Sequence, residues 1–527
     1  MKSNAKKLNH TTPAKLAFIG LILAIASIAC TFSSLASAEP LFKPPEGTKQ
    51  WTFTPPLPDP VLETPMPTAS AQISPPVEAT PSPTAEIINT TPFLYYSQAG
   101  DTLPVVAVRF GVKPDEITSP EPIPTTSLLN PGQLLIIPRR LTNATSSQHL
   151  MPDSEVVFSP SAVDFDVSAF VEQAGGYLSR HSEYLASTGL TRSADIIARV
   201  AIENSINPRL LLALLEYQSG WVYGEPADLA KSDYPMGKID LKYKSLYHQL
   251  TWAVNQLSIG YYDWREGRLT EIHFSDGITA RLAPDLNAGT AALQYFFAQL
   301  NNSQDWLSAL DPQAGLPTLH ERMFGNPWVR ARVVEPLYPP DLVQPPLILP
   351  IMVSQIWGYT GGPHGAWERD GARAAIDLAP GSLESGCVET EAWTVASAAG
   401  LVLRSWNGIV ALDLDGDGRE QTGWVLIYLH VADDGRIPSG TWVEAGDRLG
   451  HPSCEGGFST GTHIHFARKY NGEWIAADGP LPFVLSGWTV HAGTNPYEGT
   501  LTRDGETVYA SQLGAFSSRI IRRQDDP

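Results

Sequence analysis

Cysteine is scarce in this sequence, which has 3 cysteines among 527 residues. The first, Cys30, lies in an apolar N-terminal segment, so a mature exported chain would keep only Cys387 and Cys454. Two cysteines in an exported protein predict one disulfide, because oxidising compartments let such bonds persist. Two free structural thiols are the alternative.

Basic residues are also few compared with acidic ones. The chain has 36 Lys and Arg residues against 55 Asp and Glu residues, which gives a formal net charge of −19. A chain with this balance has no general electrostatic attraction for nucleic acid or anionic lipid. We therefore expect no nucleic-acid partner, and we expect any bound polymer to be recognised by its shape and by hydrogen bonds.

The apolar run from Leu16 to Ala29 is shorter than the about 20 residues that a membrane-spanning helix needs. Lysines precede it, and the small residues Ala36 and Ala38 follow it. This pattern predicts a signal peptide over residues 1–38 and a protein that is secreted, extracellular or associated with the cell wall. The alternatives are an uncleaved membrane anchor and a lipid attached to Cys30.

The length of the chain predicts two or three folded units, at roughly 100–200 residues per domain. Residues 39–92 are rich in Pro, Thr and Ser, a composition that predicts an extended linker. The next segment, residues 93–139, has a short strand pattern, the turn "AGDT", an amphipathic stretch and a closing "NPGQLLIIP". It predicts a compact βαβ unit.

This unit resembles the LysM module, which binds the N-acetylglucosamine-containing glycans of cell walls. The residues that carry the resemblance include Gly100, Asp101 and Thr102 at the front and the "NPGQLLIIP" segment at the back. The resemblance implies that these three front residues bind glycan. The region of the second helix departs from the usual pattern, with "TSPEPIPTTS" in its place.

After a linker over residues 140–165, residues 166–340 show helical spacing in segments such as "PRLLLALLEYQSGW". They predict an all-α domain that resembles the lysozyme-like lytic transglycosylases, whose catalytic glutamate directly precedes a serine. Here Gln218 precedes Ser219, and an amide cannot serve as the general acid of glycoside cleavage. We expect a degenerate, non-catalytic domain. The alternative is that another carboxylate, such as Glu203 or Glu216, serves as the catalytic acid.

The C-terminal region, residues 345–515, consists of short apolar runs with glycine between them, which predicts a mainly antiparallel β domain. Its segment "GTHIHFA" carries His463 and His465. Residues two apart on a strand share one face, so these imidazoles converge. The segments "AAIDLAP" and "IYLH" add Asp377 and His430.

The order Asp, His, His-x-His on strands resembles the lysostaphin-type zinc endopeptidases, the duplicated hybrid motif fold. The resemblance implies that Asp377 and His465 are zinc ligands. It implies that His430 and His463 orient and activate the attacking water or stabilise the oxyanion. A catalytic zinc keeps three protein ligands and an open position, which agrees with this division of roles.

The third ligand departs from the family pattern His-x-x-x-Asp, which would place it at Arg373. An arginine is a permanent cation and cannot bind zinc. His364, in "YTGGPHGAW", is the favoured replacement, because glycines permit a loop there to turn back toward the sheet. The alternative is a site that binds zinc poorly, in a domain without activity.

The segment "DLDGDGRE", with Asp413, Asp415 and Asp417, resembles the first half of a calcium loop. The bidentate glutamate expected at the twelfth position is Trp424. An acidic hairpin tip is therefore the preferred interpretation.

Together these features predict a multidomain protein with a small LysM-like βαβ module, an all-α lysozyme-like domain and an antiparallel β peptidase domain. The predicted function is that of a secreted zinc endopeptidase that cuts peptide bonds in peptidoglycan, with its LysM-like module on the wall glycan. We also predict a disulfide between Cys387 and Cys454 that joins two loops bordering the site. The rival functions are a metal-free wall-binding scaffold or activator, and a glycosidase acting through the helical domain.

Overall fold

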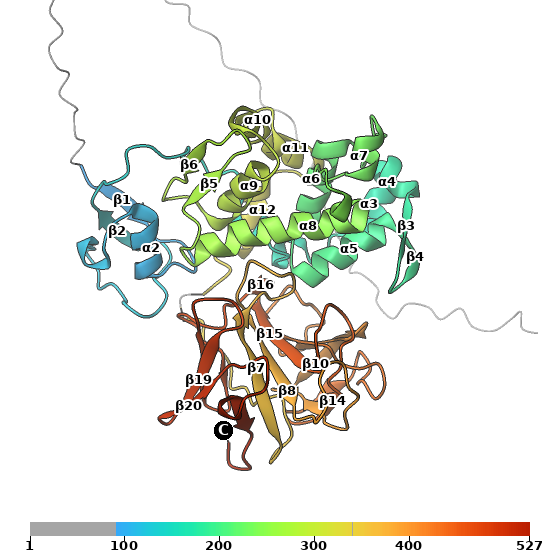
Figure 1. Cartoon of the computed structure of the whole chain (residues 1–527). Coiled ribbons are helices and arrows are strands. Elements are labelled where there is room, and N and C mark those ends of the chain that lie inside the picture. Colours follow the sequence, from blue (N-terminus) through green and yellow to red (C-terminus); the bar gives the residue numbers. More distant parts are fainter. Residues whose placement is uncertain (1–90, 340, 527) are drawn as a thin grey trace, which may run out of the picture. The chain divides into compact units, whose positions relative to one another are not determined.

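The computed structural model describes residues 91–339 and 341–526 (Figure 1), which belong to one compact unit, Glu86–Pro527. The predicted signal peptide and all but the last two residues of the predicted linker over 39–92 lie outside the described residues. Among the described helices, none is long and apolar enough to cross a membrane.

The N-terminal module is built from two strands and one full helix. Its elements are β1 (Phe93–Tyr96), α2 (Leu103–Phe110), the short η1 (Pro114–Glu116) and β2 (Leu134–Ile137). The two strands pair antiparallel, and the helix packs its apolar face on them in a small core of its own. A second full helix is missing from the described residues 117–133, because their prolines remove helix donors and disfavour helical dihedrals in the residue before each. The predicted βαβ order is confirmed.

The following region is helical. Its helices are α3 (Val167–Ala174), α4 (Tyr177–Arg180), α5 (Ser193–Asn204), α6 (Pro208–Ser219), α7 (Leu229–Asp233), α8 (Leu246–Ser258), α9 (Ala288–Ala298), α10 (Ser303–Ala309), α11 (Leu316–Phe324) and α12 (Pro327–Val334). Helix α6 shows how the sequence sets the boundaries. The side chain of Asn207 caps the helix by accepting a hydrogen bond from the backbone N–H of Arg209 in the first turn, and Pro208 occupies the first helical position. Gly220 ends the helix with a φ of 69°.

The prediction of an all-α domain was wrong in one respect. The region also contains two short hairpins, β3 (Ser182–Leu185) with β4 (Gly189–Arg192) and β5 (Glu271–His273) with β6 (Thr279–Arg281). Each is two strands of three or four residues joined by a short turn. Such short pairs carry too little apolar alternation to be detected in the sequence.

The C-terminal region is an antiparallel β domain, as predicted. Its main sheet has the strand order β13-β10-β11-β12-β15-β8-β7-β21, with β16 paired to β15. The strands are β7 (Ile356–His364), β8 (Ala375–Pro380), β10 (Gly400–Trp406), β11 (Ile409–Asp413), β12 (Trp424–Leu429), β13 (Trp442–Val443), β15 (Ile464–Tyr470), β16 (Glu473–Trp474) and β21 (Arg519–Ile521). Because β21 pairs with β7, the sheet extends past the predicted domain end at residue 515.

Smaller sheets complete this domain. One contains β17 (Val484–Leu485), β18 (Trp488–Ala492), β19 (Gly499–Arg503) and β20 (Glu506–Tyr509), and another pairs β9 (Thr394–Val395) with β14 (Arg448–Gly450). A disulfide joins Cys387 to Cys454 with a Cα–Cα distance of 5.8 Å, so the predicted pairing is confirmed.

The two faces of the main sheet have different neighbours, because successive side chains on a strand alternate in direction. On β8, Ile376 and Leu378 belong to the core inside the β domain, whereas Ala375 belongs to the core of the helical region. On β15, Phe466 and Ala467 divide in the same way. The helical region therefore covers part of one sheet face.

Candidate metal centre

Three side chains from neighbouring strands converge at one end of the main sheet. His364 ends β7, Asp377 lies in β8, and His465 lies in β15, directly opposite Asp377 in the strand register. The carboxylate Oδ1 is 3.3 Å from His364 Nε2 and 3.3 Å from His465 Nδ1, and these two nitrogens are 3.0 Å apart. Each of the three residues is buried, at 2 to 7% exposure.

The outer nitrogen of each ligand imidazole is fixed by a backbone carbonyl. His364 Nδ1 donates to the carbonyl of Gly362 at 2.8 Å, and His465 Nε2 donates to the carbonyl of Ala366 at 2.9 Å. Since a carbonyl only accepts, the proton of each neutral ring lies on that outer nitrogen, and the inner nitrogen presents a lone pair. Buried Asp377 Oδ1 accepts no hydrogen bond of good geometry from the described residues. Three acceptors thus face one point, an arrangement that suits Zn²⁺.

The charge state of Asp377 agrees with this arrangement. Burial alone would raise the pKa of Asp377, but its interactions with the neighbouring His364, His465 and His463 outweigh burial and hold that pKa well below its usual value. The carboxylate is therefore ionised, as a metal ligand must be.

The third ligand is thus His364, thirteen positions before Asp377, and the preferred sequence prediction is confirmed. Arg373 points elsewhere and donates to the carbonyl of Thr494 at 3.4 Å. The predicted reason for the glycines was wrong, however. Gly361 and Gly362 lie in strand β7, whose register with β8 shifts twice between Tyr359 and His364, and only Gly365 lies in the loop that follows.

Gly361 has a steric role in this strand. A Cβ atom at this position would lie 2.5 Å from Asp377 Oδ2, closer than any normal contact. Only glycine therefore lets β7 approach the carboxylate so closely.

His463 and His430 lie beside the three ligands. His463 Nε2 is 3.5 Å from Asp377 Oδ1, and the rings of His463 and His430 are 4.6 Å apart. His463 Nδ1 donates to the carbonyl of Gly461, and His430 Nδ1 donates to that of Glu455, each at 2.7 Å. Among the described residues, none forms a hydrogen bond with the Nε2 of either histidine. Burial, followed by the charges of His463 and His465, lowers the pKa of His430 to about 3, so its ring is neutral.

Tyr497 is a neighbour of the site that sequence reasoning missed. Its ring stacks on that of His364, with centroids 4.1 Å apart and planes 20° apart. Its backbone is joined to β7 through Gly362, which donates to the Tyr497 carbonyl at 2.9 Å. No sequence signal could have placed this turn residue against a histidine 133 positions earlier in the chain.

The loop between His364 and Asp377 is held by the helical region. The carbonyl of Gly371 accepts a hydrogen bond from Arg268 at 3.0 Å, and a Cβ on Gly371 would lie 2.2 Å from Ser258 Oγ. Within the loop, Ala366 donates to the carbonyl of Ala372 at 3.0 Å. The Ala366 carbonyl also accepts the hydrogen bond from His465 Nε2. This loop therefore connects Arg268 of the helical region to the zinc ligand His465.

The disulfide supports the opposite side of the site. The segment that contains Cys387 is hydrogen-bonded to Thr462, which donates to the carbonyl of Gly386 at 3.1 Å and accepts from Val388 at 2.8 Å. Thr462 directly precedes His463. The disulfide therefore fixes a loop that orients the His-x-His strand.

The predicted glycan-binding residues have mixed positions. Asp101 is buried at 1% exposure, and its carboxylate accepts hydrogen bonds from Tyr95 at 2.5 Å, Gln98 at 2.8 Å and Arg109 at 2.8 Å. Its observed role is internal. Gly100 and Thr102 line a separate cavity of about 500 Å³. Glycan binding by the module stays a prediction.

The acidic segment forms a hairpin tip between β11 and β12, the preferred interpretation. Asp413, Asp415 and Asp417 lie close enough together to hold a cation. The Asp413 carboxylate already accepts hydrogen bonds from backbone groups of the tip, including that of Gly418 at 2.9 Å.

The glycosidase candidates in the helical region are engaged in structural contacts. Glu216 accepts hydrogen bonds from the backbone of Val222 and Tyr223 at 2.9 and 3.1 Å. Glu203 is buried and pairs with Arg199 at 3.0 Å. Neither carboxylate is presented as a free acid.

The chain is similar to several known proteins. Residues 149–339 match the family described as "LasA, N-terminal domain". This match gives the helical region a relative other than the lysozyme-like enzymes, for which there is no support. Among solved structures, the M23 metalloprotease pseudoalterin from the deep sea is 21% identical with a TM-score of 0.28, over 34% of this chain and 99% of that one. The catalytic domain of lysostaphin from Staphylococcus simulans is 21% identical with a TM-score of 0.17, over 23% of this chain and 87% of that one.

The chain is thus a metallopeptidase homologue with a His–Asp–His zinc site. One relative among characterised proteins is Protease LasA of Pseudomonas aeruginosa strain UCBPP-PA14, which is 26% identical over 369 residues. The alignment covers 67% of this chain and 80% of that protein. LasA of strain PAO1 is 25% identical over 364 residues.

Proposed function

We propose that this protein is a secreted zinc-dependent endopeptidase that hydrolyses peptide bonds in the cross-links of peptidoglycan. The observation that carries the proposal is the convergence of three ligand atoms on one point, beside two histidines that each have a free Nε2. The relationship to Protease LasA and the resemblance to lysostaphin-type enzymes support this substrate class.

The residues divide into holders of the metal and groups that handle protons. His364, Asp377 and His465 would hold zinc, which when bound would supply the Lewis acidity for activating water and polarising a peptide carbonyl. His430 is neutral and its Nδ1 proton is committed to the carbonyl of Glu455, so its Nε2 can accept a hydrogen bond and orient the attacking water. His463 Nε2 lies on the same side, at the distance from Asp377 given above, and can hold a proton for the departing amine.

The N-terminal module contributes attachment in this proposal. A LysM-like unit bound to glycan would raise the local concentration of cross-links around the peptidase. The predicted linker and signal peptide, which precede the described residues, would place this assembly outside the cell.

The two rival functions are less well supported. A metal-free scaffold would have no use for two ligand rings with inward lone pairs beside an ionised, buried carboxylate, since such an arrangement is costly without a cation. A glycosidase in the helical region would need two free carboxyl groups on opposite sides of a sugar, but Glu203 and Glu216 are both engaged.

Product analysis of purified cell walls tests the proposal. The wild-type protein should release new amino termini from the walls without new reducing sugar ends, and Asp377→Ala should release neither. New reducing ends without new amino termini would identify a glycosidase. An absence of both from zinc-loaded wild-type protein would favour the scaffold.

A further inference from the structure

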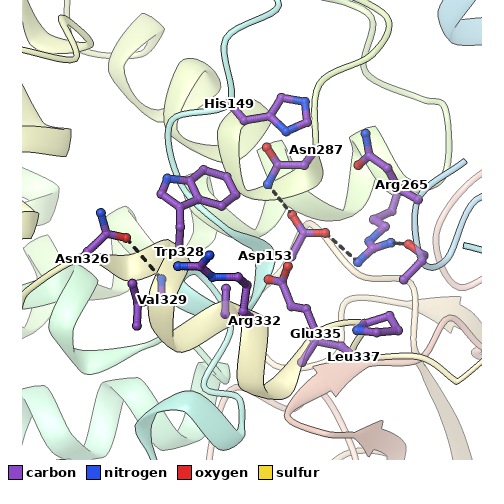
Figure 2. A pocket seen from close by; sticks show the side chains of 14 residues that line it. His149, Asp153, Arg265, Asn287, Asn326, Trp328, Val329, Arg332, Glu335 and Leu337 are labelled. Carbon is purple, nitrogen blue, oxygen red and sulfur yellow. Dashed lines mark hydrogen bonds and ion pairs between the residues drawn. The ribbon is translucent and has the colours of Figure 1, made fainter. Parts of the chain in front are cut away.

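A cavity of about 660 Å³ lies away from the metal centre, between the module and the helical region (Figure 2). Its volume falls within the roughly 300–1,000 Å³ that is usual for small-molecule sites. Helix α12 and the residues that follow it form one wall. Gln98, His149 and Asn287 are among the residues of the other walls.

Helix α12 and the residue after it bring three different chemical groups to this cavity. Trp328 and Arg332 are four residues apart in α12 and so share a face, and Glu335, which directly follows the helix, also lines the cavity. Figure 2 shows their side chains along the wall, with the indole of Trp328 next to His149. The rings of His149 and Trp328 are nearly parallel, with planes 25° apart and centroids separated by 6.4 Å.

The groups on this face have unused hydrogen-bonding capacity. Within the described ranges, Arg332 is exposed and makes no ion pair or hydrogen bond. Glu335 accepts a hydrogen bond from the backbone of Ser154 at 2.8 Å through one of its two carboxylate oxygens. Burial and, after it, the charge of Asp153 raise the pKa of Glu335, which brings its protonated form closer to neutral pH.

Arg265, the other cation of the cavity, is fully engaged by contrast. It pairs with Asp153 at 3.0 Å and with Glu473 at 3.1 Å, and it also donates to the carbonyl of Ala99. Arg332 is therefore the cation that a ligand could engage.

We propose that this cavity binds an N-acetylated amino-sugar unit of the wall glycan. The indole of Trp328 offers a flat apolar surface for the C–H face of a pyranose ring. Arg332 would donate to the acetamido carbonyl, and Glu335 would bond a hydroxyl group. The choice of a wall sugar rests on the proposed function; the choice of a saccharide rests on this set of side chains.

Other ligand classes fit these groups less well. A purely apolar ligand would remove Arg332 and Glu335 from water without a partner, which is costly. A highly charged anion would face the carboxylates of Asp153 and Glu335. A saccharide uses both the aromatic face and the polar groups.

The position of the cavity also suits a polymer. Gln98 and Ala99 line it and directly precede Gly100, which lines the cavity beside the module. A glycan strand held at the module would therefore have its next units close to Trp328.

Titration calorimetry of the full chain with the tetrasaccharide of N-acetylglucosamine tests the inference. Trp328→Ala should weaken binding at least tenfold, and Arg332→Ala about fivefold. Trp328→Phe should retain part of the affinity. The matched control is Trp442→Ala, which removes an exposed tryptophan of the β domain, far from this cavity in the chain, and should bind like wild type.

Exposed Arg332 can be replaced without loss of the fold, so its variant keeps the test valid even if Trp328→Ala unfolds. Wild-type affinity in both Trp328→Ala and Arg332→Ala would overturn the inference. So would loss of binding only in Thr126→Arg, which blocks the cavity beside the module. Asp377→Ala should bind the sugar normally and lose peptide release. A wild-type protein that releases peptides but does not bind the sugar would overturn this inference and leave the proposed function standing.

Discussion

Replacement of Gly361 by alanine should weaken zinc binding through steric pressure on one ligand. The new Cβ would lie 2.5 Å from Asp377 Oδ2 and 3.0 Å from the Cβ and Cγ atoms of Asp377. Optimal separations of non-bonded carbon atoms are about 3.5–4.0 Å, so the carboxylate or the strand must move by about 1 Å. Gly361 is not among the glycines with positive φ, so its backbone accepts alanine and the effect falls on the ligand.

The expected loss of zinc affinity can be estimated from other metal sites. Changes that disturb ligand orientation without removing a ligand typically cost about 10- to 100-fold in metal affinity, which is about 1.4–2.7 kcal/mol. Competition with a chromogenic chelator measures this loss directly.

The matched control is Gly358→Ala on the same strand. There the nearest atom, Thr360 Cγ2, would be 3.4 Å from the new Cβ, and no Asp377 atom is among its nearest neighbours. Gly358→Ala should bind zinc like wild type. If folded Gly361→Ala also binds zinc within twofold of wild type, the steric reasoning is refuted.

Three further predictions concern the surroundings of the site. Arg268→Ala should weaken zinc binding severalfold, as measured by chelator competition, because it releases the loop at Gly371 that orients His465. Arg268→Lys should recover part of the loss. Equal zinc affinities in the wild type and both variants would contradict this coupling. Replacement of both Cys387 and Cys454 by serine should lower the free energy of unfolding by about 2–4 kcal/mol in urea, and an unchanged midpoint would exclude a stabilising role. Gln218→Ala should leave wall degradation unchanged, and a loss of more than about tenfold in a folded variant, roughly 1.4 kcal/mol in barrier, would make the helical region catalytic.

Local patterns predicted much of the metal centre. The two-residue spacing of His463 and His465 predicted that both side chains would converge, and both approach Asp377 Oδ1, although His463 directly precedes β15. Asp377 and His430 lie in or directly after apolar strand segments, and the resemblance to the lysostaphin-type enzymes implied their roles. The remaining ligand, His364, could be inferred only by elimination, because the spacing in this chain differs from the expected pattern.

Contacts between distant segments could not be predicted. The stacking of Tyr497 on His364 and the bond from Arg268 to the loop at Gly371 join residues more than 100 positions apart. Such pairs leave no periodicity in the sequence. The same limit applies to Asp101, which was predicted to bind glycan but is buried by partners that only the fold brings together.

The zinc content of His364→Ala tests the central claim most directly. The protein should bind one zinc ion in the wild type and in Arg373→Ala, as measured by elemental analysis after dialysis. His364→Ala should lose zinc as completely as Asp377→Ala, because each removes one of three protein ligands, while His463→Ala should keep the metal and lose peptide release. Full zinc occupancy in His364→Ala, or a wild-type protein that binds no zinc, would contradict the account.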